Sequence, residues 1–486
     1  MAANSAAASE ADAADHLVAA GGRIGQARGG YVAGAWNVDF ISGSAVVIDR
    51  RGNGNVNITK VEVLDIRFPT SKEDIGSDAV NKDPDYSAAY CILETDAGVR
   101  GFGLTFTLGR GTDLVVLAAK FLARFVEGRT LEWITSNWVA FTQELTGDTQ
   151  YRWLGPDKGV VHLAAASLVN AVWDLYARVE GKPLWRLLAE MTPEQIVAAV
   201  DFKYITDAIT PSEALELLKR QKAGYQGRLA QLERLGYPAY TTSVGWFGFS
   251  DEKIQLLADD ALADGWVNFK LKVGGEAEND LRRARLIRKA IGADKRLMAD
   301  ANQKWDVSEA IARIKHLAEA DLWWMEEPTS PDDVLGHATI RKAVAPVKIA
   351  TGEHCQNKVI FKQLFQANSI DICQIDSARV LGVNENLAIL LMAAKFDVMV
   401  CPHAGGVGLC EYVQHLSMWD YLACSGTMEN RMIEFVDHLH EHFVEPCRIE
   451  QGHYMMPTAP GYSIEMVEET LRDYRFPEGK VWREAS

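Results

Sequence analysis

Several classes of protein are disfavoured by what this sequence has little of. Cysteine is sparse: seven residues in 486, an odd number, scattered and never spaced as Cys-x-x-Cys, so we expect reduced thiols rather than a disulfide framework. No uncharged apolar run approaches the roughly 18 residues of a membrane-spanning helix, and we expect no membrane partner. Positive charge is in deficit, with 50 basic against 66 acidic residues. The net charge of −16 disfavours binding to nucleic acid or anionic lipid.

The residues that are present suit a large globular protein. Hydrophobic residues make up 48% and charged residues 24% of the chain, so it can bury a sizeable core without disulfides or partners. An acidic protein that acts on a small anion must supply local positive charge, and a divalent cation with a few lysines does so. A group of this kind is therefore the feature to look for in the sequence.

The sequence predicts an extension, two domains and a tail. Residues 1–56 are rich in Ala and Gly and fit neither a secretory signal nor a basic transit peptide, so we expect a flexible extension and a cytoplasmic location, with a mitochondrial one left open. Residues 57–200 mix strand-like alternation with helical periodicity and predict an α+β domain. Residues 201–444 alternate short apolar strands with amphipathic helices, as parallel sheets do. Residues 445–486 lack this repeat and are expected to return to the first domain.

Eight candidate strands predict an α/β fold with a (β/α)8 barrel of the TIM type, capped by an α+β domain that the N-terminal region and the C-terminal tail form together. The strands are AYTTSVGW, VNFKLKV, RLMADAN, LWWMEEP, VKIATGEH, IDICQID, VMVCPHAG and MIEFVDHL. Active sites of such barrels lie at the carboxyl ends of the strands. Polar residues recur there 28, 26, 27, 23 and 27 positions apart, namely Lys272, Asp300, Glu326, Glu353, Asp376 and His403.

Three of these residues are acids from successive strands. Because the carboxyl ends of neighbouring strands lie together, Asp300, Glu326 and Glu353 can converge on one hard cation and leave positions open for substrate oxygens. Oxygen ligands of this kind favour Mg²⁺. Each acid alone is equally explained as a strand-terminal charge or a helix cap, so the prediction of a magnesium site depends on their common spacing.

Two pairs of residues predict acid–base chemistry beside the acids. Lys270 and Lys272 are two positions apart, so their side chains share one face of a strand, and we expect their mutual repulsion and a nearby cation to lower a lysine pKa toward neutrality. Asp376 and His403 end consecutive strands, where a carboxylate can orient an imidazole as a general acid.

The whole pattern resembles the enolase superfamily, specifically its mandelate racemase-like group. Within it the chain resembles the L-fuconate dehydratases and their eukaryotic relatives, from about Thr59 to the C-terminus. The strings that carry the resemblance are RFPTS, GSDA, DPDYSAAY, FKLKVGG, ADANQKW, EEPTSPDD, GEHCQNK, CPHAGGVGL and EFVDHLHEHF.

This resemblance implies the dehydration of a small anionic sugar acid, L-fuconate to 2-dehydro-3-deoxy-L-fuconate, with Mg²⁺ as cofactor, in a homo-oligomer. Lys272 is expected to remove the C2 proton, and Lys270 and the metal to stabilise the resulting enediolate. His403, held by Asp376, is expected to protonate the departing 3-hydroxyl. Glu434 matches the acid of the eighth strand, which hydrogen-bonds the substrate carboxylate if it is kept protonated.

The resemblance also implies substrate-binding residues outside the barrel core. Arg67, Ser71 and Asp78 lie in a polar segment like the loop by which the family's capping domain closes over the barrel. Trp246 ends the first strand and is expected to line the same pocket, and Asn302 flanks a metal ligand. The alternative is a mobile surface loop without ligand contacts.

Rival functions share much of this machinery. The same bases on opposite faces of a substrate can racemise or epimerise it, or dehydrate another acid such as L-galactonate. A catalytically silent regulatory relative is disfavoured because every expected catalytic residue is present, and a zinc hydrolase is disfavoured because carboxylates stand where its histidines belong. The run that follows the eighth strand is interpreted as structural, since no spacing in it matches a known ligand set; its residues are Asp437, His438, His440, Glu441 and His442.

Overall fold

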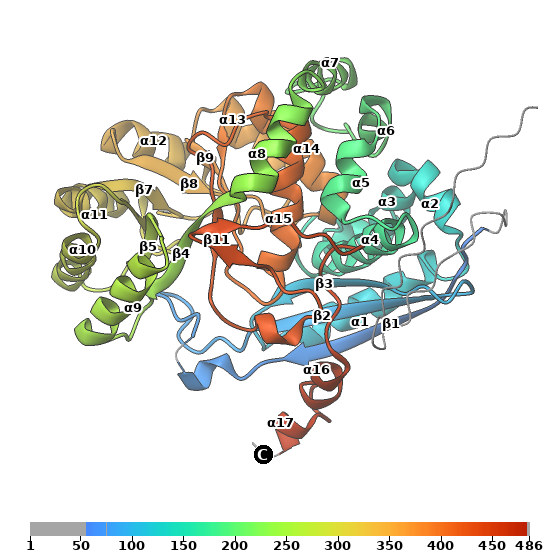
Figure 1. Ribbon diagram of the computed structural model, residues 1–486, viewed down its shortest axis with the longest axis horizontal. Coiled ribbons are helices and arrows are strands. Elements are labelled where there is room, and N and C mark those ends of the chain that lie inside the picture. The colour runs from blue at the N-terminus through green and yellow to red at the C-terminus, as the bar shows by residue number, and fades with distance from the viewer. Residues whose placement is uncertain (1–54, 74, 484–486) are drawn as a thin grey trace, which may run out of the picture. The chain divides into compact units, whose positions relative to one another are not determined.

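The computed structural model describes residues 55–73 and 75–483, so almost all of the predicted extension lies outside the described residues. The first domain begins with an antiparallel sheet of β1 (Ile58–Arg67), β2 (Ser87–Thr95) and β3 (Gly101–Thr107) in that order (Figure 1). Its helices are α1 (Thr112–Leu122), α2 (Leu131–Ser136), α3 (Trp138–Thr146), α4 (Gly159–Val179), α5 (Leu184–Glu190) and α6 (Pro193–Ala198). The predicted α+β character is confirmed.

Helix α4 is the central helix of this domain. Gly103 on β3 lets it approach closely, because an added Cβ there would lie 2.2 Å from the backbone oxygen of Ser167 on α4. On another face of α4, Trp173 stacks on Trp138 with ring centroids 4.2 Å apart. Helix α4 is long and apolar enough to cross a membrane by length and composition, but 78% of its most apolar window is buried inside the protein, as expected for a core helix.

Eight parallel strands of the described chain form the barrel, and all eight predicted strands are present. They are β4 (Tyr237–Gly245), β5 (Asn268–Lys272), β6 (Arg296–Asp300), β7 (Leu322–Glu326), β8 (Lys348–Thr351), β9 (Ile372–Cys373), β10 (Met399–Val400) and β11 (Ile433–Phe435). Each pairs with the next as far as β10, and β11 pairs with β4. Between β10 and β11 the Glu434 N–H donates to the Pro402 carbonyl at 3.2 Å in place of a ladder.

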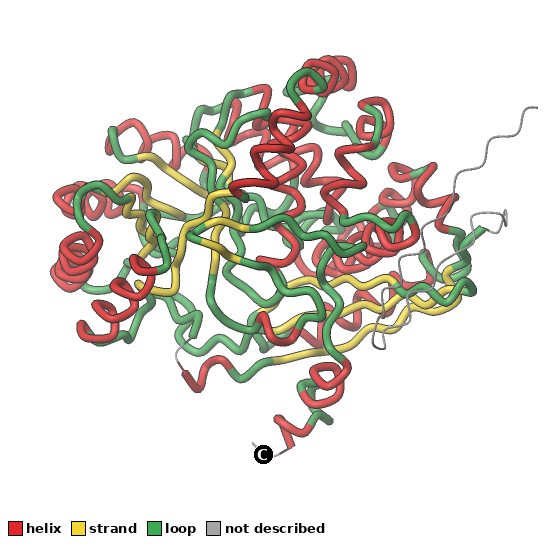
Figure 2. The backbone as a smooth tube through the Cα atoms, viewed as in Figure 1, coloured by secondary structure: helices red, strands yellow, loops and turns green. Residues whose placement is uncertain are grey.

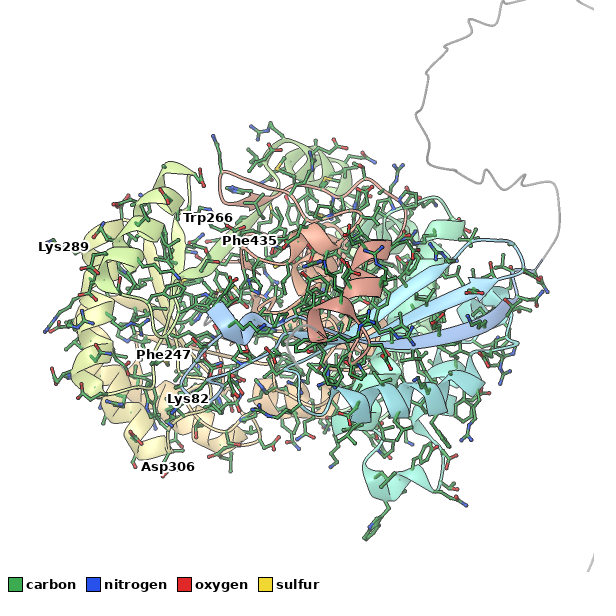
Figure 3. All side chains as sticks on the ribbon, turned by 90° about the horizontal axis from the view of Figure 1, so that it is seen from below. Lys82, Phe247, Trp266, Lys289, Asp306 and Phe435 are labelled. Carbon is green, nitrogen blue, oxygen red and sulfur yellow. The ribbon has the colours of Figure 1, made fainter. Side chains whose placement is uncertain are left out.

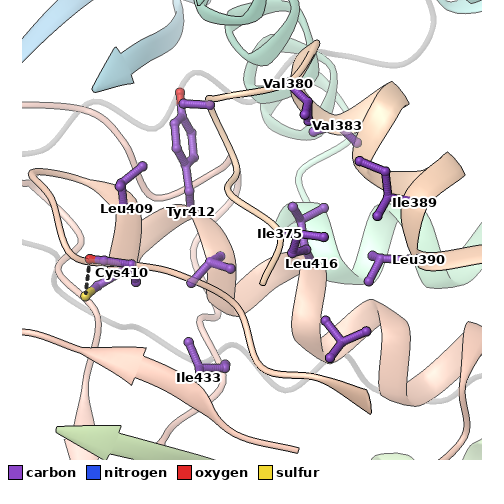
Figure 4. Packing of buried hydrophobic residues seen from close by; sticks show 14 of the residues in the cluster. Ile375, Val380, Val383, Ile389, Leu390, Leu409, Cys410, Tyr412, Leu416 and Ile433 are labelled. Carbon is purple, nitrogen blue, oxygen red and sulfur yellow. Dashed lines mark hydrogen bonds between the residues drawn. The ribbon is translucent and has the colours of Figure 1, made fainter. Parts of the chain in front are cut away.

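Helices surround these strands, as Figure 2 shows in red around yellow. Preceding or linking the strands are α7 (Pro211–Gln221), α8 (Tyr225–Leu235), α9 (Asp251–Ala263), α10 (Ala277–Ile291), α11 (Val307–Leu317), α12 (Val334–Val344), α13 (Lys358–Gln366), α14 (Gly382–Lys395) and α15 (Leu409–Trp419). Figure 4 shows the apolar packing behind the later strands, where Ile389 of α14 and Leu416 of α15 lie with Ile375 in one cluster.

The inside of the barrel holds a separate small core. Each of its residues lies on a different strand or next to its end, and side chains on a strand alternate between the two faces. The residues are Tyr240, Met298, Trp324, Ala350, Ile372, Cys401 and Met432. Two positions beyond Met298 and Trp324 come Asp300 and Glu326, which the same alternation points inward. The last residues of β5, β6 and β7 lie side by side in the sheet, because Lys272 pairs with Asp300 and Asp300 pairs with Glu326. The apolar core therefore forms a floor beneath a ring of charged side chains.

The C-terminal tail returns to the first domain, as predicted. It forms β12 (Ile449–Glu450) and β13 (His453–Tyr454), the second of which pairs with β4, and then α16 (Glu468–Asp473) and α17 (Lys480–Arg483). The Phe476 N–H donates to the Asp65 carbonyl of β1 at 2.8 Å, and Figure 1 shows α16 close to β1. The predicted fold class is confirmed, while the exact domain boundaries stay a prediction.

Candidate active site

A cavity of about 240 Å³ lies at the carboxyl ends of the barrel strands. Of the predicted site residues, it is lined by Asp78, Trp246, Lys272, Asn302, Glu353, Asp376, His403 and Glu434. The first domain contributes further lining residues, Asn81, Tyr86, Phe106 and Leu163 among them. Residues as far apart in sequence as Gly76 and Val436 thus line one cavity between the barrel and its cap.

The loop between β1 and β2 covers part of the barrel mouth. Ser77 Oγ donates a hydrogen bond to the Phe247 carbonyl, which follows β4, at 3.2 Å. In Figure 3 the labelled Lys82 of this loop lies over the same edge of the barrel as Phe247. Asp78 orders the loop by accepting hydrogen bonds from the backbone N–H groups of Val80 and Asn81, each at 2.7 Å.

The three acids predicted to hold a metal are brought together. One carboxylate oxygen from each of Asp300, Glu326 and Glu353 lies within 4.8 Å of the other two, and all three residues are buried. Glu353 Oε2 is buried without a hydrogen-bond partner among the described residues. A buried carboxylate oxygen that lacks a hydrogen bond and lies in a cluster of carboxylates is stabilised by a bound cation. These residues therefore fit a hard divalent cation such as Mg²⁺.

Lys270 lies beneath the cavity, with a fully buried side chain. Its Nζ is 2.7 Å from Glu326, 2.8 Å from Glu434 and 3.6 Å from Asp300. Burial lowers its pKa, but the attraction of Glu326 and Glu434 outweighs burial and raises the pKa well above its usual value. Lys270 is therefore a fixed positive charge under the reacting centre.

Lys272 faces the cavity, and its Nζ lies 2.6 Å from Asp300 Oδ2. Burial and the positive charge of Lys270 lower its pKa, but the attraction of Asp300, together with that of Glu353 and Asp78, outweighs them and leaves the pKa raised. The protein groups alone therefore do not produce the predicted lowering of a lysine pKa toward neutrality, and the part of that prediction that depends on a cation stays a prediction. The prediction counted the neighbouring amine and a cation, whereas the direct contact with Asp300 became visible only in the fold.

His403 and Asp376 form the predicted pair. The His403 Nδ1–H donates to Asp376 Oδ2 at 2.8 Å, and Nε2 lies 3.5 Å from Glu353. Burial lowers the pKa of His403, but Glu353 and Asp376 raise it to about 9. Imidazolium is therefore the expected form at neutral pH. The Gly405 N–H lies 3.2 Å from Nε2 and suits the neutral ring, so both protonation states have a partner, as an acid–base group requires.

Glu434 lies between Lys270 and His403. It contacts Lys270, accepts from Thr242 Oγ1 at 2.5 Å and from the Ala404 N–H at 2.9 Å. Burial raises its pKa, but Lys270 and His403 together lower it to about 2. Glu434 is thus ionised in these surroundings, so the condition set for its hydrogen bond to a substrate carboxylate is not met.

Two of the predicted substrate-binding residues do not reach the cavity. The Arg67 guanidinium donates to Asp65 at 2.7 and 2.8 Å and stacks on the Phe476 ring, 3.7 Å from its centroid. Ser71 Oγ donates to Asp85 at 2.7 Å. Both side chains stabilise the cap itself, because the C-terminal tail and the neighbouring loop supply partners that the sequence did not reveal.

Other lining residues were missed by the sequence analysis. Arg379 adds a cation to the wall, and its Nε donates to the Glu353 carbonyl at 3.0 Å. Tyr86 packs edge-on against Phe106 with ring centroids 5.0 Å apart. His354 bridges Glu327 and Glu353 at 3.1 and 3.3 Å. Tyr86 and His354 lie inside strings that carry the family resemblance, so that signal could have found them, whereas Arg379 had none.

Fold and site together define a barrel protein with a cluster of three carboxylates beside lysine and histidine side chains at the carboxyl ends of its strands. Two family models match the chain: the mandelate racemase / muconate lactonizing enzyme N-terminal domain over residues 84–189, and the enolase C-terminal domain-like family over residues 253–470. The chain belongs to the enolase superfamily, in its mandelate racemase-like group.

The relatives it resembles extend over most of its length. Mitochondrial enolase superfamily member 1 of Xenopus laevis is 56% identical over 430 residues, which covers 88% of this chain and 97% of that protein. L-galactonate dehydratase of Hypocrea jecorina is 51% identical over 434 residues, covering 88% and 96%. A crystal structure of the human mitochondrial enolase superfamily member 1 has a TM-score of 0.88 at 53% identity and covers 89% of this chain and 99% of that one.

Proposed function

We propose that this protein is a magnesium-dependent dehydratase of a six-carbon sugar acid, with L-fuconate as the first candidate substrate and L-galactonate as the second. The observation that carries the proposal is the joint placement of Lys272, the His403–Asp376 pair and Glu353 around one cavity, with Asp300 and Glu326 clustered on Glu353. The high identity to an L-galactonate dehydratase over nearly the whole of both chains supports the reaction class.

Lys272 is the residue placed to remove the C2 proton. Its Nζ lies at the cavity wall, next to the carboxylates that are to hold the cation. A bound divalent cation would polarise the substrate carboxylate and so make the neighbouring C–H more acidic. With Asp300 engaged by that cation, the attraction that raises the Lys272 pKa is reduced, which favours the neutral amine that a base requires.

His403 is the residue placed to deliver a proton to the departing 3-hydroxyl. It is protonated at neutral pH and oriented through Nδ1 by Asp376, which itself accepts from the N–H groups of Ala378 and Arg379 at 2.7 and 2.8 Å. The loss of hydroxide as water leaves an enol, which tautomerises to the 2-keto-3-deoxy acid. Lys270 stays charged below and offsets the negative charge that develops when the C2 proton leaves.

The choice between the two substrates concerns a single group. L-Fuconate is 6-deoxy-L-galactonate, so the two acids present the same configuration at the reacting carbons and differ by one hydroxyl. The cap side of the cavity carries polar Asp78 and Asn81 but also apolar Phe106 and Leu163. A pocket that hydrogen-bonds the C6 hydroxyl rejects the deoxy acid by several orders of magnitude, whereas an apolar pocket discriminates by about 10²-fold or less.

The test is formation of α-keto acid from L-fuconate, L-galactonate and D-arabinonate, with Mg²⁺ and after chelation. We expect product from one of the first two acids, loss of activity on chelation and recovery with Mg²⁺. Lys272→Ala should abolish product, whereas the control Lys304→Ala, which changes an exposed lysine beyond β6, should retain it. Keto acid from D-arabinonate alone would contradict the proposed substrates.

Two other outcomes would overturn the dehydratase assignment. Deuterium exchange at C2 without keto product would identify a racemase or epimerase that uses the same bases. Neither exchange nor product from any acid of the panel, with folded and Mg²⁺-loaded protein, would point to the catalytically silent relative.

A further inference from the structure

A second cluster of metal-ligand side chains lies apart from the residues that line the cavity. It consists of Cys410, His440 and Cys447, whose Sγ, ring nitrogen and Sγ atoms all lie within 4.8 Å of one another. Cys410 is in the first turn of α15, His440 begins the short 3-10 helix His440–His442 after β11, and Cys447 is in the tail that leads to β12. The three residues join three separate segments.

The histidine ring is held by contacts at both nitrogens. The His440 Nε2–H donates to the Val436 carbonyl at 2.8 Å, and the Nδ1–H donates to the Glu411 carboxylate at 2.7 Å, so a metal at Nδ1 would replace that proton. The distance from Nδ1 to Cys447 Sγ is 3.7 Å. A backbone carbonyl that accepts from the other ring nitrogen is a usual partner of metal-bound histidine. The orientation of His440 is also fixed by the parallel ring of Phe435, 5.2 Å away.

A fourth ligand stands beside these three. Glu411 is buried, and its Oε1 lies 2.7 Å from His440 Nδ1 and accepts from the Cys447 N–H at 3.3 Å. Zinc bound tetrahedrally by sulfur at ~2.3 Å and nitrogen at ~2.0 Å separates such ligand atoms by about 3.5 Å. The 3.7 Å between His440 Nδ1 and Cys447 Sγ is close to that spacing, whereas Glu411 Oε1, 2.7 Å from Nδ1, would have to move away from the ring to become the fourth ligand.

We propose that Cys410, His440, Cys447 and Glu411 form a structural zinc site, separate from the carboxylate centre of the cavity. Thiolate and imidazole ligands select Zn²⁺ over Mg²⁺, and four protein ligands close the coordination sphere, as structural zinc sites require. The sequence analysis interpreted the histidine run as structural, and in the present proposal His440 would find its partners in residues 30 positions upstream and 7 positions downstream, a spacing that fits no local motif.

The ion would tie together the segments that carry two active-site residues. Cys410 Sγ donates to the Ala404 carbonyl at 3.6 Å, and the Ala404 N–H donates to Glu434. Ala404 directly follows His403. A zinc ion here would fix the loop after β10 to the segment after β11. His403 and Glu434 would then keep their positions relative to each other.

The test uses full-length protein stripped of metal under reducing conditions and titrated with Co²⁺ in the presence of excess Mg²⁺. Thiolate coordination gives a near-ultraviolet charge-transfer band and intense visible bands of tetrahedral Co²⁺, which oxygen ligands do not. We expect these bands to saturate at one equivalent and to disappear when Zn²⁺ is added. Cys447→Ser should weaken binding at least tenfold, while Cys424→Ser, which changes a buried cysteine outside the cluster, should bind as the unaltered protein does.

A second readout is alkylation of thiols. Zn²⁺ should protect Cys447, the partly buried member of the cluster, from iodoacetamide, and chelation should expose it. The proposal is overturned if only the weak absorption of oxygen-bound Co²⁺ appears, if Cys447→Ser keeps the thiolate band, or if iodoacetamide alkylates Cys447 equally fast with and without Zn²⁺. Because none of these readouts uses a substrate, they are independent of the dehydratase assignment.

Discussion

Removal of the charge of Lys270 is expected to destabilise the fold strongly. Lys270→Met keeps the length of the side chain but leaves Glu326 and Glu434, which now lie 2.7 and 2.8 Å from the ammonium, without their nearest counter-charge. A buried ion pair broken in this way costs ~3–5 kcal/mol. Lys272→Met is the matched control, because Lys272 has one carboxylate within 4 Å and a side chain that is 13% exposed.

The cost of Lys270→Met converts into a measurable shift of the melting temperature. An unfolding entropy of ~2.1 cal/mol/K per residue gives about 0.9 kcal/mol/K for about 430 residues, so the variant should melt roughly 3–6 °C lower. Lys272→Met should lose less than half of this. The assay is calorimetric or fluorescence-detected melting of metal-free protein at pH 7.

The difference between the two melting-temperature shifts tests whether burial and the number of carboxylate partners set the cost of losing a lysine charge. Equal shifts would show that burial of Lys270 and its number of carboxylate partners do not set the cost. No shift for Lys270→Met would show that the carboxylates are relieved in another way, by uptake of a proton, and would refute the picture of a permanently charged lysine beneath the cavity.

Other predictions follow from single contacts. Burial lowers the pKa of His415 to about 3, so between pH ~6.5 and ~3 the unfolded chain binds a proton that the folded chain does not. The free energy of unfolding should therefore fall with falling pH by up to ~1.4 kcal/mol per pH unit. His415→Gln should reduce this dependence on pH in melting curves. Gly103→Ala should cost ~1–3 kcal/mol through its clash with α4, whereas Gly227→Ala, exposed inside α8 with open space around it, should stabilise by ~0.5–1 kcal/mol. Asp376→Asn should reduce turnover by ~10²–10⁴-fold and shift the pH profile that His403 controls, without a change in melting temperature beyond ~2 °C.

The barrel and the principal site residues could be read from the sequence because their signals are local and periodic. Each βα unit places one polar residue after an apolar strand, so the spacing from Lys272 to His403 encoded a ring of functional groups before any fold was known. The strand register, with Lys272 level with Asp300 and Asp300 with Glu326, then brought this ring together.

Contacts between distant segments had no such signal. Arg67 was expected at the substrate and instead stacks on Phe476, more than 400 positions later in the chain, and the cluster around His440 joins residues whose spacing matches no motif.

What the sequence by itself determined is which chemical groups stand at the end of each strand, since alternation and repeat length depend only on neighbouring residues. What the tertiary structure alone decided is their charge state. The sign of the Lys272 pKa shift and the ionisation of Glu434 depend on which opposite charge lies within about 3 Å in a buried site, because electrostatic energies there change steeply with distance and with exclusion of water.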